Sequence, residues 1–243
     1  MTSRVVCIGG AVFDRKYRAN KDIIAATSNP VKGFCSHGGV ARNIAENLAR
    51  LGVDVGFISI VGDDENGRFL LEHLGALGVD VEQVITSDAG STAEYIAILD
   101  PRHDLALGLA DMDIFDLLLP ARLEAVWPML ALADWVFADC NLPRETLAAL
   151  IEHKRQGRFR LAVDAVSTPK AQKLRGQLDG IDLLFLNHDE ADAISGIAAT
   201  DRQPMEKAAA ALLNAGVDAV ILTGGGSGYV VASAAGVETM KPV

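Results

Sequence analysis

The chain has 243 residues, half of them apolar and only 5% aromatic, and its formal net charge at pH 7 is −10. This composition suits a core of buried strands and packed helices and argues against disorder. The negative charge argues against a nucleic-acid polymer or an anionic membrane as partner. The three cysteines form no C-x-x-C pair, so neither a disulfide framework nor a zinc site is expected. The first apolar run is too short for a membrane span, and we expect a cytoplasmic protein.

Hydrophobic spacing predicts strands and helices that alternate along the chain. The expected elements are a strand at Val5–Ile8, a helix at Ala41–Leu51, a strand at Val53–Ile60, a helix at Arg68–Leu77, a strand at Thr92–Leu99, a helix at Leu123–Leu132, a strand at Trp135–Ala138, a helix at Glu145–Lys154, strands at Phe159–Val163 and Leu183–Leu186, a helix at Glu206–Ala215 and a strand at Ala219–Leu222. The segment from Lys16 to His37 is irregular and is expected to form a small separate sheet with Thr92–Leu99. The alternation predicts an α/β fold with an open, mainly parallel sheet and helices on both faces.

The pair Gly38-Gly39 precedes the first predicted helix and is the most informative part of the sequence. Two glycines let the backbone approach a ligand closely. The helix that follows is expected to present free backbone N–H groups and the positive end of its dipole. Asn43 adds an amide that both donates and accepts hydrogen bonds. Spacing alone also allows a plain turn between a strand and a helix.

Polar residues or glycines follow the inferred strands at seven places. They are Asp14, Gly38, Asn141, Asp164, Asn187, Glu190 and Thr223. Ligand sites in open α/β sheets lie beyond the carboxyl ends of the strands, so these residues are expected to form one composite site. An ionised Asp14 only accepts hydrogen bonds, which suits paired hydroxyl groups, although a solvated turn residue is an equal alternative from the sequence. Asp164 and Lys170 flank a Pro-containing loop. For Lys170 a solvated ion is the default interpretation, and a role in binding phosphate or substrate is the alternative.

The run Gly38–Ala45, followed by Gly52 and Gly62, resembles the first signature of the ribokinase-type (PfkB) sugar and nucleoside kinases. The resemblance implies a single ribokinase-like kinase domain over residues 1–243, with a small β lid from about 16–37 and 91–110. It implies that Gly38, Gly39 and Asn43 hold the hydroxyls of the phosphate acceptor. By the same resemblance, Asp14 binds ribose hydroxyls and Asn141 contacts the sugar.

The same resemblance implies ATP and Mg²⁺ as cofactors. Asn187-x-x-Glu190 is similar to the N-x-x-E motif of the family, in which Glu190 would help to hold the metal and Asn187 the phosphates. One carboxylate is adequate because Mg²⁺ keeps several waters. The alternative is an N-capping Asn with an acid in the first turn. The loop from Thr223 to Gly228 resembles the one that carries the nucleotide phosphates, through Thr223, Gly225 and Gly228.

Within the family, several segments look like pseudouridine kinase. They are Ser28–Lys32, Gly38–Gly52, Asp111–Ile114, Ala138–Asn141 and Val163–Ser167. The implied reaction transfers the γ-phosphoryl group of ATP to the 5′-hydroxyl of pseudouridine, and a homodimer through the lid is also implied. Other kinases of the family, acting on adenosine, inosine or a simple sugar, are the near alternative. A dehydrogenase is disfavoured because the glycines form no G-x-G-x-x-G motif.

The second signature of the family, D-T-x-G-A-G-D, is absent from the sequence. Its last Asp is the general base of the family, so no catalytic residue is assigned to this chain. The sequence stops roughly where the strand leading to that segment would begin, and we therefore expect a domain that is incomplete at its C-terminus. A module that binds a nucleoside without catalysis is the third alternative.

Overall fold

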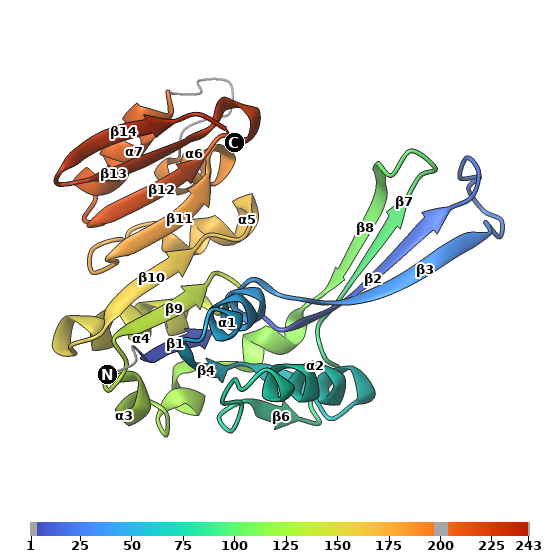
Figure 1. Cartoon of the computed structure of the whole chain (residues 1–243), viewed down its shortest axis with the longest axis horizontal. Coiled ribbons are helices and arrows are strands. Elements are labelled where there is room, and N and C mark those ends of the chain that lie inside the picture. Colours follow the sequence, from blue (N-terminus) through green and yellow to red (C-terminus); the bar gives the residue numbers. More distant parts are fainter. Residues whose placement is uncertain (1–3, 197–203, 243) are drawn as a thin grey trace.

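The computed structural model describes residues 4–196 and 204–242 (Figure 1). Its largest element is an eight-stranded sheet. Across the sheet, the strands are β14 (Gly236–Met240), β13 (Tyr229–Ser233), β12 (Ala219–Thr223), β11 (Leu183–Asn187), β10 (Arg160–Asp164), β9 (Trp135–Asp139), β1 (Arg4–Ile8) and β4 (Asp54–Ile58). The strands from β12 to β4 are parallel to one another. β13 pairs antiparallel with β12, and β14 pairs antiparallel with β13. The expected open, mainly parallel sheet is therefore confirmed.

Helices pack on both faces of this sheet, because successive residues of the parallel strands are apolar and point to opposite faces. On one face, α1 (Val40–Arg50) and α2 (Glu65–Ala76) pack against β1 and β4. On the other face lie α4 (Arg144–Gln156), α5 (Thr168–Ala171), α6 (His188–Ser195) and α7 (Met205–Asn214). Each face has its own apolar cluster, which includes Val6 and Ile8 on the α4 side and Cys7 on the α1 side. None of the described helices is long and apolar enough to cross a membrane.

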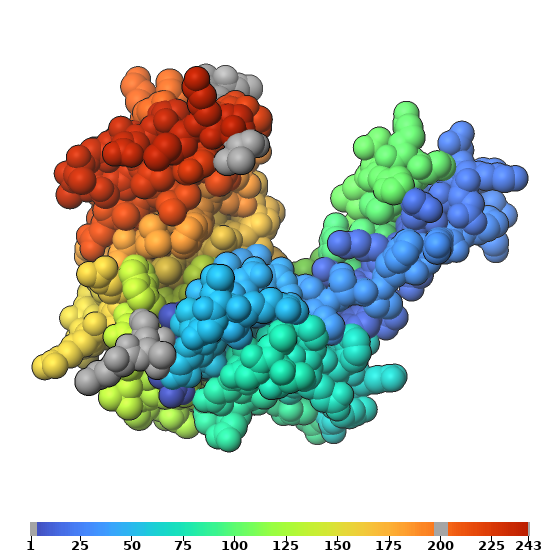
Figure 2. All heavy atoms as spheres, in the orientation of Figure 1, coloured from blue at the N-terminus to red at the C-terminus, as the bar shows by residue number. Residues whose placement is uncertain are grey.

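A four-stranded sheet projects away from the large one (Figure 1). Its strands are β3 (Val31–Gly38), β2 (Val12–Ala19), β7 (Glu94–Leu99) and β8 (Leu105–Asp111), in that order. A broad hollow separates it from the C-terminal strands of the large sheet (Figure 2). Half of the segment from Lys16 to His37 is strand, because residues 12–19 and 31–38 pair in register as an antiparallel hairpin, while residues 20–30 connect the two strands.

Two predicted elements are interrupted. The helix expected at Leu123–Leu132 is reduced to α3 (Trp127–Leu130), because Pro128 has no N–H for the preceding turn and can stand only near a helix start. The strand expected at Val53–Ile60 ends at Ile58. There the buried hydroxyl of Ser59 donates to the carbonyl of Gly9 at 2.6 Å, and the chain leaves the large sheet and enters a separate, third sheet. That two-stranded sheet consists of β5 (Ile60–Gly62) and β6 (Ile85–Ser87).

The remaining described elements are short. They are the 3₁₀ turns η1 (Asp113–Leu117), η2 (Pro120–Leu123), η3 (Gln172–Leu174) and η5 (Gly225–Ser227). The hairpin of β13 and β14 was not expected from the sequence. Strand β14 carries a weaker apolar pattern than the buried parallel strands and is exposed throughout.

Candidate active site

A cavity of about 210 Å³ lies where the small sheet meets the start of α1. It is lined by Val12, Asp14, Gly38, Gly39, Val40, Asn43, Tyr95, Met112, Asn141, Val166 and Lys170. All five residues predicted to bind the acceptor therefore surround one space, although they come from β2, the β3–α1 turn, α1 and the loop after β9. That they bind the acceptor remains a prediction.

The carboxylate of Asp14 covers Gly38 on the neighbouring strand. A Cβ at Gly38 would lie closer than 3.0 Å to the carboxyl atoms of Asp14, so any other residue there would displace the Asp14 side chain. Burial raises the pKa of Asp14, and the positive charges of Lys16 and Arg42 counteract the effect. Asp14 lies within β2 and not in a loop directly after β1, because the chain re-enters a strand at Val12. The expected position of Asp14 was thus wrong in detail.

The backbone at the start of α1 is already hydrogen-bonded within the protein. The N–H of Ala41 donates to Oδ2 of Asp139 at 2.8 Å, and the N–H of Arg42 donates to the carbonyl of Gly10 at 3.2 Å. The N–H of Asn43 donates to the carbonyl of Gly39 at 2.9 Å. The expectation that this helix start offers free N–H groups is therefore wrong for these three residues. The Asp139 carboxylate, 98 positions away in the sequence, engages only the N–H of Ala41. The Gly10 carbonyl engages that of Arg42, and the bond of Asn43 to Gly39 belongs to the helix itself.

Gly39 is required by the backbone at the same turn. Its backbone φ is +94°, a value that residues with a side chain rarely adopt, and a Cβ there would overlap the carbonyl of Gly10. This position gives the chain room to pass directly from β3 into α1.

The side chain of Arg42 fixes the orientation of Asn43. Arg42 is only 3% exposed, and its guanidinium donates to the carbonyls of Gly38 at 2.9 Å and His37 at 3.2 Å. It also donates to Oδ1 of Asn43 and pairs with Glu46 at 2.5 Å. The NH₂ group of Asn43 is free of that contact and can donate to a ligand, and its oxygen keeps a second lone pair.

Lys170 forms part of the cavity wall, although the sequence favoured a solvated ion. Its Nζ donates to Oδ1 of Asn141 at 2.5 Å and lies 3.2 Å from Sδ of Met112. Burial lowers the pKa of Lys170, while the nearby charge of Asp139 counteracts the effect. This contact could not be predicted from the sequence, because the short helix α5 that carries Lys170 is packed onto the site only by the tertiary fold.

A second cavity of about 250 Å³ opens at the carboxyl ends of β10, β11 and β12. It is lined by Asp164, Phe185, Leu186, Asn187, Glu190, Ile221 and Thr223. Burial, together with the negative charges of Asp139 and Glu190, raises the pKa of Asp164 to about 6, although the N–H of Val166 counteracts this by donating to its carboxylate. Two carboxylates thus share one half-enclosed space at the end of the sheet.

Asn187 and Glu190 form a complete capping box at the start of α6. Oδ1 of Asn187 accepts from the N–H of Glu190 at 2.9 Å, and Oε2 of Glu190 accepts from the N–H of Asn187 at 2.8 Å. Nδ2 of Asn187 also donates to Oε1 of Glu190 at 2.9 Å. The capping alternative raised from the sequence is therefore present in the structure. Each carboxylate oxygen keeps a further lone pair for water or a cation.

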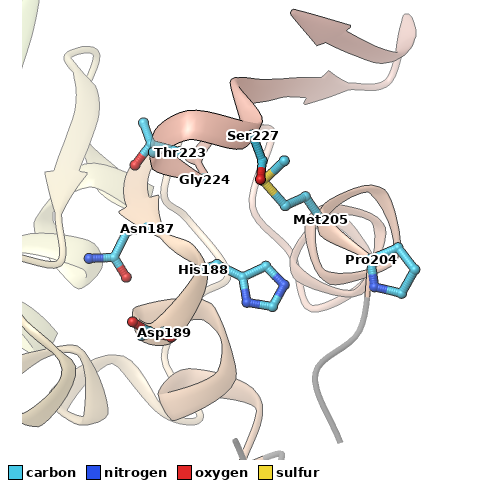
Figure 3. Close-up of a pocket in the computed structure, with 9 residues that line it drawn as sticks. Asn187, His188, Asp189, Pro204, Met205, Thr223, Gly224 and Ser227 are labelled. Atoms are coloured by element: carbon cyan, nitrogen blue, oxygen red, sulfur yellow. The ribbon is translucent and has the colours of Figure 1, made fainter. Parts of the chain in front are cut away.

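A third cavity, of about 470 Å³, lies between the starts of α6 and α7 and the loop after β12 (Figure 3). Thr223 and Gly225 line it, together with His188, Met205 and others. Gly228 lines none of these three cavities. Its N–H donates to the carbonyl of Gly225 at 3.0 Å, and its φ of +88° and the adjacent Met240 carbonyl explain why it is glycine.

A model of the pfkB family of carbohydrate kinases matches residues 2–243. The chain belongs to the PfkB family. It is 34% identical to a pseudouridine kinase of Escherichia coli (strain K12), over 92% of this chain and 71% of that protein. Among solved structures, a carbohydrate kinase from Agrobacterium tumefaciens is similar with a TM-score of 0.85 at 33% identity, over 95% of this chain and 73% of that one.

The fold of this PfkB chain is ribokinase-like. An Arabidopsis thaliana ribokinase in complex with ribose and ATP has a TM-score of 0.85 against it, covering the whole of this chain and 78% of that one. At 18% identity this likeness shows the fold alone. The family and the fold that the glycine-rich signature implied are therefore confirmed.

Proposed function

We propose that this PfkB chain binds a nucleoside in the 210 Å³ cavity and serves the transfer of the γ-phosphoryl group of ATP to its 5′-hydroxyl, with pseudouridine as substrate. The observation that carries the proposal is the convergence of Asp14, Asn43 and Asn141 on one cavity. A carboxylate and two amides, one beside a lysine, provide both acceptors and donors for a polyhydroxylated ligand.

The walls of the cavity favour an acceptor with a base over a bare sugar. Val12, Tyr95, Met112 and Val166 add apolar and aromatic surface beside the polar groups. A planar base buries such surface, whereas a simple sugar presents mostly hydroxyls. The similarity to the pseudouridine kinase supports pseudouridine as that nucleoside. Another nucleoside or a sugar, as the family name suggests, is the alternative.

ATP and Mg²⁺ are proposed to occupy the cavities at the ends of β10, β11 and β12. Mg²⁺ prefers carboxylate oxygens and water, and Asp164 with Glu190 offers that donor set. When bound, the metal ion neutralises charge on the phosphates. Thr223 is proposed to offer its hydroxyl to the phosphates, and Gly225 a backbone without a side chain. Asn187, which lines the same cavity, is proposed to help hold the phosphates. No general base is assigned among the described residues.

The small sheet is proposed to act as a lid that excludes water from the acceptor. Asp14 and Gly38 belong to its strands β2 and β3, so the cavity wall and the lid are continuous. Apolar side chains exposed on the sheet support its use as an interface in a homodimer. They are Val31, Phe34, Leu105, Leu107 and Leu109.

Calorimetric titration with pseudouridine, uridine, inosine, adenosine and ribose tests the substrate, and coupled assays with ATP and Mg²⁺ test the transfer. Tight binding of pseudouridine with turnover supports the proposal. Binding without turnover would favour a nucleoside-binding module, and preference for ribose or another sugar would overturn the nucleoside assignment. An Asn43→Ala variant should lose acceptor binding while it keeps ATP binding.

A further inference from the structure

Asp139, the last residue of β9, lies beneath the proposed acceptor site and is fully buried, with 0% exposure. It does not line the 210 Å³ cavity. Its carboxylate accepts three backbone hydrogen bonds, from Gly10 at 3.0 Å, Ala41 at 2.8 Å and Asn141 at 2.9 Å. One buried side chain thus joins the loop after β1, the start of α1 and the loop after β9.

Each of these three segments supplies or supports a wall of the cavity. Asn141 is itself a wall residue. Asp139 accepts from its backbone N–H, and its side-chain oxygen accepts from Lys170. Ala41 follows the turn at Gly39 directly. The carbonyl of Gly10 accepts from the N–H of Arg42 and lies against Gly39, so the loop after β1 holds the same turn from below.

The sequence pattern around Asp139 fits this arrangement. A Cβ at Gly9 would lie closer than 3.0 Å to the carboxyl carbon and both carboxyl oxygens of Asp139. A Cβ at Gly10 would lie 2.5 Å from Nδ2 of Asn141. The pair Gly9-Gly10, which the proposed function leaves unexplained, is therefore glycine because the buried carboxylate and Asn141 occupy the space of any side chain.

Helix α1 also depends on this carboxylate. Its N-cap residue Gly39 has no side chain to cap it, and no acidic residue stands in its first turn. Asp139 supplies from another strand the acceptor and the negative charge that a helix start favours. Burial raises the pKa of Asp139, and the three N–H donors counteract the effect.

We propose that Asp139 is the positioning residue of the acceptor site: it fixes the Gly38-Gly39 turn relative to Asn141 without touching the nucleoside. This inference rests on the proposed function, because it names what the three hydrogen bonds hold in place. A positioning role predicts that loss of Asp139 weakens nucleoside binding and leaves ATP binding intact.

The test compares Asp139→Asn with Asp134→Asn in the full chain. Asp134 flanks the opposite end of β9, where its carboxylate also accepts a backbone N–H, that of Arg4 at 2.9 Å. An amide at position 139 turns one acceptor into a donor that faces an N–H group. Because the variant loses a buried hydrogen bond to a charged group, we expect pseudouridine affinity to fall about tenfold or more. ATP affinity and the Asp134→Asn variant should stay within about twofold of the wild type.

Hydrogen exchange supplies a readout that does not depend on the ligand. In the wild type, the amides of Gly10, Ala41 and Asn141 should exchange slowly, and in Asp139→Asn at least one of them should lose protection. Fast exchange of these amides in the wild type would overturn the inference, and this measurement stands even where the variant does not fold.

The outcomes separate the two proposals. A wild type that binds no nucleoside contradicts the proposed function. A wild type that binds pseudouridine, with an Asp139→Asn variant of equal affinity, contradicts the positioning role alone. Equal losses of nucleoside and ATP affinity would show general structural damage and would also overturn it.

Discussion

The carboxylate of Asp164 should destabilise the folded chain at neutral pH, and Asp164→Asn should remove that effect. Burial and two neighbouring carboxylates raise its pKa from the ordinary value of 3.8 to about 6. An acid whose pKa is raised in the folded state stabilises the fold fully at pH values below its pKa in the unfolded state, which is near 4. That contribution is lost as the pH rises through about 6.

The size of the effect follows from the two pKa values. A tenfold difference in proton affinity corresponds to about 1.4 kcal/mol, so a rise from 3.8 to about 6 corresponds to at most about 3 kcal/mol above pH 7. Because Asp164 is only half-buried, we expect about 1–3 kcal/mol. The variant keeps the native contact, since an Asn oxygen can still accept from the N–H of Val166, which lies 2.8 Å from the carboxylate.

The assay is urea unfolding of the wild type and Asp164→Asn between pH 4 and pH 8, with a chelator to remove divalent cations. We expect equal free energies of unfolding near pH 4 and a more stable variant at pH 7.5. Asp88→Asn, at an exposed position, controls for the change in net charge. A difference between the two proteins that is the same at both pH values, or a wild type that is more stable at pH 7.5, would refute the reasoning.

Three further substitutions test separate parts of the structure. Gly38→Ala places a methyl group against the carboxylate of Asp14, so nucleoside affinity measured by calorimetry should fall about tenfold; an unchanged affinity would contradict the packing argument. Asp64→Ala removes the N-cap of α2 and two bonds from Thr92, at 2.7 Å each, and should lower the free energy of unfolding by about 1–3 kcal/mol. A loss below about 0.5 kcal/mol would show that the cap is dispensable. Glu190→Gln removes the charge and leaves one oxygen to accept from Asn187 in place of two, so Mg²⁺ should enhance ATP binding less than in the wild type while pseudouridine binds equally well. Unaltered dependence on Mg²⁺ would remove Glu190 from the proposed metal site.

Local patterns in the sequence were sufficient for most of the large sheet. Buried parallel strands such as Leu183–Leu186 are continuous apolar runs, and this signal does not depend on distant residues. The small sheet was harder to delimit, because its strands are half-exposed and one of them, β8, is exposed throughout. Pro128 shows the reverse case, in which an apolar helical pattern was overridden by one residue without an N–H group.

The seven residues grouped by their place after strands were expected to form one composite site, and the structure divides them between the 210 Å³ and the 250 Å³ cavities. The supports of the acceptor cavity were not predictable in the same way. Asp139 acts on backbone groups 129 and 98 positions away, and nothing in the local sequence distinguishes it from other acids that end a strand. Gly228 was assigned to the nucleotide from a glycine-rich pattern, whereas its positive φ and the packing of Met240 account for it.

The acceptor cavity is divided between two bodies, and this has a thermodynamic consequence. Asp14 and Gly38 lie on strands of the small sheet, whereas Asn43 and Asn141 belong to the part built on the large sheet. A ligand that bridges both halves gains affinity only in the conformation that brings them together, so binding and the orientation of the small sheet are linked by one free energy. Substitutions far out on the small sheet that bias its orientation should therefore change acceptor affinity without touching the acceptor. A proposed ligand whose hydroxyls contact both parts would therefore stabilise one orientation of the small sheet relative to the large sheet.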